Sequence, residues 1–288
     1  MSDLTGKRVL VTGATSGIGK VAARELKGMG ATVVALGRDP AKLAVLASEL
    51  RIETLQCDLS SLADIRRAAA DYKRRFPKLH VLLNNAGAIH HKRTLSRDGY
   101  EMTFAVNHLA YFLLTRELLD ALKASSPSRI VNVASEASRA APGKVDLNDL
   151  QYEGWRGGRD GLRAYARSKR MNLLFTFELA RRLEGSGVTA NAVHPGAVST
   201  GFAMQAGWLG TVWKLLSPFL LTPERGAQTM IWLASQPELE KISGEYFFKK
   251  REISAIGQAY DRDLQRALWE ASEKLVSSPS PPARAATR

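Results

Sequence analysis

Short apolar runs alternate with longer amphipathic stretches along most of the chain. The runs are rich in β-branched residues and are bounded by polar or glycine-rich turns, which is the pattern of buried strands. The longer stretches repeat apolar residues at helical spacing. We expect strands over residues 8–12, 32–36, 53–56, 81–84, 129–134, 189–193 and 244–247. We expect helices over residues 18–29, 40–50, 63–76, 104–124, 164–183 and 222–233.

This alternation predicts the fold class. Strands that alternate with helices form parallel βαβ units, whose crossovers are right-handed. The expected architecture is α/β, with a single Rossmann-type doubly wound parallel sheet flanked by helices on both faces. We assign residues 1–276 to one domain. Residues 277–288 are rich in Pro, Ser and Ala and lack periodicity, so we expect a disordered tail there.

The composition indicates in which cellular compartment the protein works. The 288 residues include a single cysteine, Cys57, which excludes a disulfide framework and favours a reducing compartment. The N-terminus lacks the basic and apolar regions of a signal peptide, so we expect a cytoplasmic protein. The most apolar segment, 208–221, has only 14 residues and is interrupted by Lys214 and Pro218. We therefore expect no transmembrane helix, and weak contact with a membrane surface stays open.

The charge balance is basic, with 41 Lys+Arg against 28 Asp+Glu and a formal net charge of +13. The basic clusters are spread over many expected elements, without a nucleic-acid-binding motif or interleaved aromatic residues. We therefore expect a solvated basic surface and no nucleic-acid partner. No metal site is expected either, because His90 and His91 lack other ligand residues nearby in the sequence. His194 is expected to be a packing residue.

A glycine-rich segment joins the first expected strand to the first helix. Residues 12–19 read TGATSGIG, with the spacing G-x-x-x-G-x-G. Glycines there allow a tight turn and close backbone approach to a pyrophosphate, which the helix N-terminus attracts. The alternative is a turn that serves packing alone. The expected dinucleotide-binding residues are Gly13, Thr15, Ser16, Gly17, Ile18 and Gly19.

The end of the second strand indicates which dinucleotide is bound. An acidic residue there would bind the ribose 2′-hydroxyl of NAD. Here Gly37 ends the strand and Arg38 follows, with a guanidinium suited to a 2′-phosphate. The sequence therefore predicts NADP(H) as the cofactor. In the alternative, Arg38 is a solvated surface residue and Asp39 caps the helix that begins at Pro40.

A tyrosine and a lysine supply candidate acid–base chemistry. Tyr165 and Lys169 are four residues apart, on one face of an expected helix. A phenol titrates near pH ~10, and an adjacent ammonium stabilises its anion. Such a pair can give a proton to a carbonyl oxygen. The alternative is a chance spacing, with Lys169 on a solvated face.

Taken together, these motifs resemble the short-chain dehydrogenase/reductase family. The resemblance covers residues 5–275 and is carried, in chain order, by residues 12–19, 57–60, 84–87, Asn107, Ser135, Tyr165 with Lys169, and 194–196. Further segments resemble the retinol-dehydrogenase-like branch, whose members are mostly NADP(H)-dependent. They are residues 146–150, 174–183, 187–189, 222–229 and 243–247.

The resemblance implies roles for individual residues. Tyr165 would transfer the proton, and Lys169 would lower the Tyr165 pKa and hold the nicotinamide ribose. Ser135 would bind the substrate oxygen, and Asn107 would hold a water linked to Lys169. Further cofactor contacts are implied for Asp58, Leu59, Asn85, Ala86, Gly87, Pro195, Gly196 and Thr200. Structural alternatives remain, because Ser135 could cap a strand end, Asn107 could satisfy buried backbone groups and Asp58 could cap a helix.

The expected function is hydride transfer between NADP(H) and the carbonyl or alcohol group of a small hydrophobic substrate. The apolar segment 202–221 is expected to form a lid; its alternatives are two short helices that complete the core, or an oligomer contact. The alternative function is a catalytically silent NADP(H)-binding regulator or scaffold, which would predict loss of Tyr165 or Lys169. The resemblance allows a homodimer or a homotetramer.

Overall fold

The computed structural model of the protein describes residues 2–140, 145–157, 160–198 and 221–277. Its strands are β1 (Arg8–Thr12), β2 (Thr32–Gly37), β3 (Glu53–Gln56), β4 (Val81–Asn84), β5 (Ser128–Val133), β6 (Val188–Val193), β7 (Tyr246–Phe248) and β8 (Arg251–Glu252). Its α-helices are α1 (Gly17–Gly28), α2 (Pro40–Leu50), α3 (Leu62–Arg75), α4 (Met102–Phe104), α5 (Ala110–Lys123), α6 (Ala137–Ala140), α7 (Asp160–Arg182), α10 (Pro223–Ser235) and α11 (Arg262–Ser277). Its other helices are the π-helix η1 (Ala105–Leu109) and the 3-10 helices η2 (Leu147–Asp149), η4 (Pro237–Leu239) and η5 (Gly257–Tyr260).

The strands form one sheet in the order β3-β2-β1-β4-β5-β6-β7-β8. All neighbouring pairs from β3 to β7 are parallel, which confirms the expected doubly wound α/β fold. The last pair differs from the expectation of a wholly parallel sheet, because β8 is antiparallel to β7. Two residues join them, Lys249 and Lys250, with φ of 49° and 60°. Positive φ at both positions matches the twist of a tight hairpin, so the chain turns back at the sheet edge.

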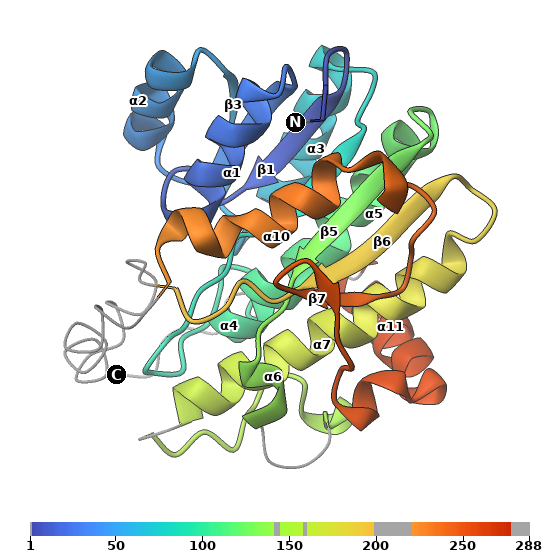
Figure 1. Cartoon of the computed structure of the whole chain (residues 1–288). Coiled ribbons are helices and arrows are strands. Elements are labelled where there is room, and N and C mark those ends of the chain that lie inside the picture. The colour runs from blue at the N-terminus through green and yellow to red at the C-terminus, as the bar shows by residue number, and fades with distance from the viewer. Residues whose placement is uncertain (1, 141–144, 158–159, 199–220, 278–288) are drawn as a thin grey trace.

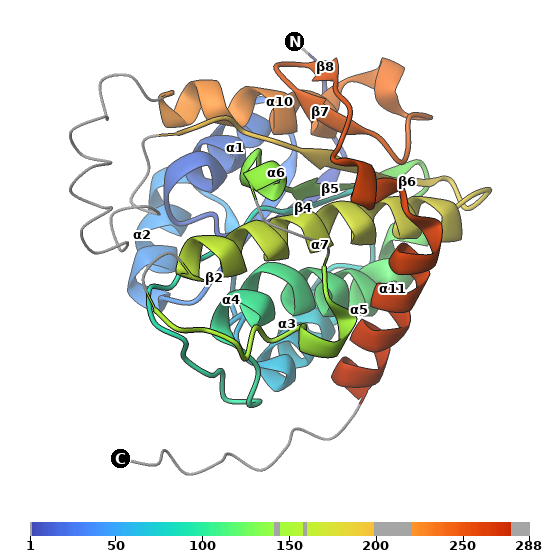
Figure 2. The same cartoon turned by 90° about the horizontal axis from the view of Figure 1, so that it is seen from below.

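Helices cover both faces of the sheet. Figure 1 looks onto the face covered by α1 and α10, and Figure 2 shows α3, α5 and α11 on the opposite face. The side chains of β1 alternate accordingly, because Val9 and Val11 join the core under α1 and α10 while Leu10 joins the core under α3, α5 and α7. Both faces of the sheet are therefore covered, and ligands of such sheets bind at the edge formed by the carboxyl ends of the strands.

A buried chain of hydrogen bonds crosses the sheet beneath that edge. The Asn84 side-chain amide on β4 donates to Thr115 Oγ1 on α5 at 3.0 Å and to Asn132 Oδ1 on β5 at 2.9 Å. Asn132 in turn donates to Thr176 Oγ1 on α7 at 3.0 Å. Buried polar groups in such a chain specify one arrangement, because each loses its partner if an element shifts. The chain therefore fixes α5 and α7 relative to the sheet.

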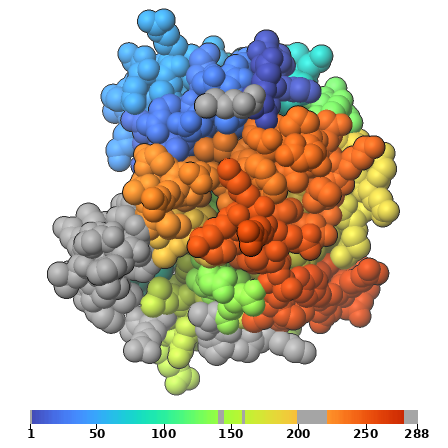
Figure 3. Space-filling model, in the orientation of Figure 1, coloured from blue at the N-terminus to red at the C-terminus, as the bar shows by residue number. Residues whose placement is uncertain are grey.

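The close approach of α10 to α1 positions the glycine-rich turn. Figure 3 shows the C-terminal segments, in orange and red, filling the middle of this face directly below the N-terminal elements, in blue. At Gly226 on α10, a Cβ would lie 2.5 Å from Val198 and 3.1 Å from the Ile18 side chain on α1. A glycine is therefore needed where these segments meet.

The structure differs from the expected elements mainly in its last helix. No helix was expected over residues 262–277, where α11 lies. Its buried positions are Gln265, Leu268, Ser272 and Val276, and two of these are polar, so the apolar periodicity is weak. Ser277, expected in the tail, is its last residue, and 278–288 lie outside the described residues.

Two further helices differ from their expected bounds. The helix expected over 104–124 is divided, because η1 interrupts it between α4 and α5. The helix expected from residue 164 begins at Asp160 instead. Among the described helices, none has the length and apolar character that crossing a bilayer demands.

Loss of the Trp269 ring should destabilise the protein through α11. The ring lies 4.9 Å from Phe112 on α5 and 5.8 Å from Phe175 on α7. We expect Trp269→Ala to lower the free energy of unfolding by about 2–3 kcal/mol in urea titrations, somewhat below the range for fully buried aromatics because the ring is half-buried. Trp269→Phe keeps an aromatic ring and should lose less than about 1 kcal/mol. Equal losses in the two variants would contradict this role of the ring.

Candidate active site

The glycine-rich turn closes on itself between β1 and α1. Gly13 and Gly17 have φ of 66° and 53°, a region that residues with a Cβ disfavour. At Gly19 a Cβ would lie only 2.4 Å from the carbonyl oxygen of Gly13. Ser16 caps α1 without a side-chain hydrogen bond, so the first N–H groups of the helix stay available to an anion. The turn thus fits the close backbone approach of a pyrophosphate.

Thr12 clamps this turn to the end of β4. Its Oγ1 accepts from the backbone N–H groups of Asn85 at 2.8 Å and Ala86 at 2.9 Å. The Asn85 side chain donates back to the Thr12 carbonyl at 2.8 Å. Asn85, Ala86 and Gly87 therefore lie directly beside the glycine turn. The role of Thr12 was not foreseen, although the residue is part of the motif.

The end of β2 lies beside the same turn. A Cβ at Gly37 would come within 3.0 Å of Thr15 Cγ2. Asp39 does not face this edge as a free carboxylate, because its Oδ1 accepts from the backbone N–H groups of Ala41 and Lys42 and caps α2. Arg38 is exposed. The pKa of His90 is lowered mainly by burial, and the positive charges of His91 and Arg38 lower it further. Arg38 is therefore close enough to His90 to act on it electrostatically.

Asp58 and Leu59 follow β3 at this edge. Asp58 Oδ1 accepts from the backbone N–H of Ser60 at 3.0 Å and from its hydroxyl at 2.8 Å. The cap of α3 is Ser61, which accepts from Asp64 N, so Asp58 is not the helix cap. Leu59 is partly buried against the core. Their contacts with an adenine stay a prediction.

Ser135 and Tyr165 meet at the carboxyl end of β5. Both side chains are half-buried. Burial raises the pKa of the Tyr165 phenol to about 12, and a hydrogen bond with Ser135 opposes that rise. Ser135 Oγ also accepts from Ala137 N at 3.2 Å, so the serine supports the first turn of α6 as well. The two hydroxyls are within reach of one substrate oxygen, as acid–base chemistry requires.

Lys169 lies behind this pair, 2% exposed. Its Nζ donates to the carbonyl of Val133 at 2.8 Å and lies 5.7 Å from the centroid of the Tyr165 ring. Burial lowers the pKa of Lys169 to about 7. Near pH 7, burial therefore keeps the Tyr165 phenol neutral and leaves the Lys169 amine about half protonated.

Asn107 holds α7 to the loop after β4. Its Oδ1 accepts from Ala88 N at 2.7 Å, and its amide donates to Ala88 O and to Ser168 Oγ, both at 2.9 Å. Ser168 in turn donates to the Tyr165 carbonyl at 2.7 Å. Asn107 thus satisfies buried backbone groups and also fixes the turn that carries Tyr165 and Lys169. Its binding of a water stays a prediction.

His194 joins the ends of β5 and β6. Its Nδ1 accepts from Gly196 N at 3.1 Å and from Glu136 N at 3.3 Å, and its ring stacks on Phe248 with centroids 4.6 Å apart. Gly196, next to Pro195, has a φ of 89°, and a Cβ there would lie 2.4 Å from the Leu221 side chain. Thr200 and residues 202–220 of the expected lid lie outside the described residues.

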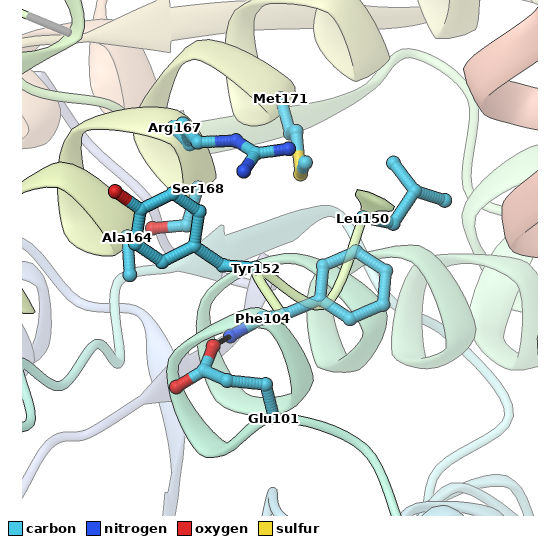
Figure 4. Close-up of a pocket in the computed structure, with 8 residues that line it drawn as sticks. All are labelled: Glu101, Phe104, Leu150, Tyr152, Ala164, Arg167, Ser168 and Met171. Atoms are coloured by element: carbon cyan, nitrogen blue, oxygen red, sulfur yellow. Dashed lines mark hydrogen bonds between the residues drawn. The ribbon is translucent and has the colours of Figure 1, made fainter. Parts of the chain in front are cut away.

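Two hollows among the described residues are not the substrate site. A cavity of about 10 Å³ lies between α4, the segment after η2 and α7, and Figure 4 shows the side chains that line it. It can hold one water molecule at most. Its lining residues are Glu101, Phe104, Leu150, Tyr152, Ala164, Arg167, Ser168 and Met171. A larger hollow of about 540 Å³ lies beside Val188, at the amino end of β6. Ligands of such sheets bind at the carboxyl ends instead.

Comparisons with known proteins agree with this geometry. The sequence model for short chain dehydrogenases matches residues 7–145. Retinol dehydrogenase 11 of Homo sapiens is 42% identical over 284 residues, which cover 96% of this chain and 88% of that protein. Retinol dehydrogenase 14 of Mus musculus is 41% identical over 292 residues, which cover 94% of this chain and 86% of that protein. The chain belongs to the short-chain dehydrogenase/reductase family.

A solved structure has the same fold over nearly the whole chain. An uncharacterised protein from Mycobacterium Paratuberculosis has a TM-score of 0.79 and 32% identity, over 98% of this chain and 97% of that one. The predicted membership of this dehydrogenase/reductase family, and the likeness to its retinol-dehydrogenase branch, are thus confirmed. The protein is an oxidoreductase related to retinol dehydrogenases, in a family that uses NAD(P).

The burial of Lys169 should be visible in the pH dependence of stability. Its pKa is lowered from 10.5 to about 7 on folding. Between these values the unfolded chain binds the proton and the folded chain does not, so wild-type stability rises with pH through this window. Lys169→Met removes that dependence. We expect the stability of the variant relative to wild type to grow by about 2 kcal/mol from about pH 9 to about pH 7.

Urea titrations at several pH values measure this difference. Lys42→Met, which removes an exposed lysine from α2, is the matched control and should show no such trend. A difference between Lys169→Met and wild type that stays constant across the window would show that Lys169 keeps an ordinary pKa in the folded protein.

Proposed function

We propose that this protein transfers a hydride between NADP(H) and the carbonyl or alcohol group of a small hydrophobic substrate, with Tyr165 as the acid–base. The observation that carries the proposal is the convergence of Ser135, Tyr165 and Lys169 at the carboxyl edge of the sheet, the same edge that carries the glycine turn. A silent regulator or scaffold would have no need of a buried lysine behind a hydrogen-bonded tyrosine.

The residues at the edge fit a phosphorylated dinucleotide. The glycine turn and the N-terminus of α1 would hold the pyrophosphate, and Arg38 would meet the 2′-phosphate. The carboxylate that NAD requires is missing at the end of β2, because Gly37 ends the strand and Asp39 is engaged by α2. This arrangement supports NADP(H) over NAD(H). When bound, the nicotinamide supplies or accepts the hydride.

The protein's own groups handle the proton and the orientation. Ser135 binds the substrate oxygen and keeps it beside the Tyr165 hydroxyl. In reduction, Tyr165 gives its proton to that oxygen as the carbonyl carbon receives the hydride. The Lys169 ammonium stabilises the phenolate left behind. The named relatives act on retinol, so a retinoid or another long apolar alcohol or aldehyde is the proposed substrate class.

Removal of the Tyr165 hydroxyl tests the mechanism. We expect Tyr165→Phe to lower kcat by at least about 100-fold, because a positioned acid–base contributes that much or more. NADPH affinity should change little. Turnover is followed as NADPH consumption against retinaldehyde, long-chain and aromatic aldehydes and steroid ketones. Tyr260→Phe, at an exposed tyrosine, is the control. NADPH binding without turnover of any substrate by the wild type would favour the silent regulator instead.

Reversal of the charge at Arg38 tests the cofactor. We expect Arg38→Asp to weaken NADPH binding roughly 10- to 100-fold, the value of a charge-assisted contact to phosphate, while NADH binding changes far less. Calorimetric titration of the purified variants measures both. Arg251→Asp makes the same change at an exposed position on β8, at the opposite edge of the sheet from β3 and β2. Equal loss of NADPH and NADH affinity would remove Arg38 from the phosphate site.

A further inference from the structure

Asn107 on η1 and Tyr111 on α5, one helical turn apart, contact two consecutive residues of α7, Ser168 and Lys169. Asn107 on η1 donates to Ser168 Oγ at 2.9 Å. Tyr111, four residues later on α5, places its ring under the next residue, with Lys169 Nζ 5.5 Å from the ring centroid. The hydrogen-bond chain through Asn84 and Asn132 fixes α5 against α7, so this contact is built into the fold.

The Tyr111 ring offers a buried aromatic face to the Lys169 ammonium. The side chain is 1% exposed, and its hydroxyl has no hydrogen-bond partner among the described residues. Burial, and then the neighbouring Tyr165, raise the pKa of Tyr111 well above its ordinary value, so the ring stays neutral. A neutral aromatic face within about 6 Å of an ammonium attracts it, most strongly where water is excluded.

Among the described residues, few other groups compensate a charge on the buried Lys169 amine. From β5 it meets the carbonyl of Val133, which also accepts from the Asn172 amide at 3.3 Å. From α7 it meets the Tyr165 ring, and from α5 the Tyr111 ring. Burial alone accounts for its lowered pKa, with no contribution from a charged neighbour among the described residues.

The titratable group one turn before Tyr111 is His108 on η1. Its ring packs against Phe175 of α7 with centroids 6.2 Å apart, and its Nε2 bonds Ser272 Oγ of α11 at 2.8 Å. Burial lowers the pKa of His108 to about 3, against an opposing hydrogen bond with Asn172, so the imidazole is neutral and adds no charge beside Lys169. Tyr111, whose ring centroid lies 5.5 Å from Lys169 Nζ, is the group on this segment that contacts the cation.

We propose that Tyr111 is a positioning residue for the reaction, whose aromatic face favours the charged form of Lys169 beside Tyr165. The proposal rests on the proposed function, since the charge matters there as the stabiliser of the phenolate. It assigns the effect to the ring, so phenylalanine should replace tyrosine and an aliphatic side chain should not.

The test measures the Lys169 pKa directly by NMR in protein labelled with ¹³C-lysine, with the resonance assigned by its absence in Lys169→Met. We expect Tyr111→Leu to lower this pKa by about 1.5 units, which corresponds to the roughly 2 kcal/mol of a desolvated cation–π contact. Tyr111→Phe should leave it within about 0.3 units of wild type, well below the size of that contact. An unchanged pKa in Tyr111→Leu would overturn the proposal, as would an equal drop in Tyr111→Phe, which would assign the effect to the hydroxyl. Tyr111→Met provides a second aliphatic variant if Tyr111→Leu does not fold.

The pH profile of turnover gives the second readout. The alkaline fall of kcat should move to lower pH in Tyr111→Leu, with its activity recovering on acidification, and should stay in place in Tyr111→Phe. A merely structural defect would lower kcat at every pH alike and would count against the proposal. If the wild type turns over no substrate, the proposed function fails, and the NMR titration still decides whether Tyr111 holds the charge.

Discussion

The burial of one lysine amine is the constraint on which the site depends. The Lys169 side chain extends from α7 to the end of β5, where the Val133 carbonyl is its one hydrogen-bond partner among the described residues, so its charge is costly wherever its neighbours shift. Burial moves the two members of the acid–base pair in opposite directions, Tyr165 up to about 12 and Lys169 down to about 7. The Tyr165 phenol is therefore neutral near pH 7. The amine is poised where modest electrostatic changes, from an aromatic face or a bound phosphate-bearing ligand, decide its charge.

The surrounding structure can be understood as what keeps this pair in place. The α7 helix is tied to the loop after β4 through Asn107 and Ser168, and to β5 through Asn132 and Thr176. On the cofactor side, Thr12 ties the glycine turn to that same loop. The loop after β4 is thus shared by both halves of the site. In the proposed reaction, a dinucleotide held by the turn and Tyr165 held by α7 would both be positioned against this common segment, so that binding would also set the reactive geometry.

Much of this could be predicted from sequence because the signals were local. The Tyr165–Lys169 spacing is one helical turn. The glycine spacing predicts a strand-to-helix turn whether the turn binds a dinucleotide or serves packing alone. What could not be predicted depends on contacts between distant segments. The inner face of α11 is half polar because Gln265 and Ser272 meet buried partners, and periodicity alone cannot show those partners. The same holds for Tyr111, because its ring contacts Lys169, which is 58 positions further along the chain.

His194 shows how a residue that looked like packing also organises the site. It packs, stacked on Phe248, but its Nδ1 also accepts from N–H groups that belong to the two loops after β5 and β6. Only the neutral imidazole can accept there, and burial first of all lowers the pKa of His194 and keeps it neutral. One nitrogen thereby sets the spacing between the strand end that carries Ser135 and the Pro195–Gly196 turn. Parallel strands bring these ends to one edge of the sheet, and it is the shared acceptor that holds their loops at a fixed separation.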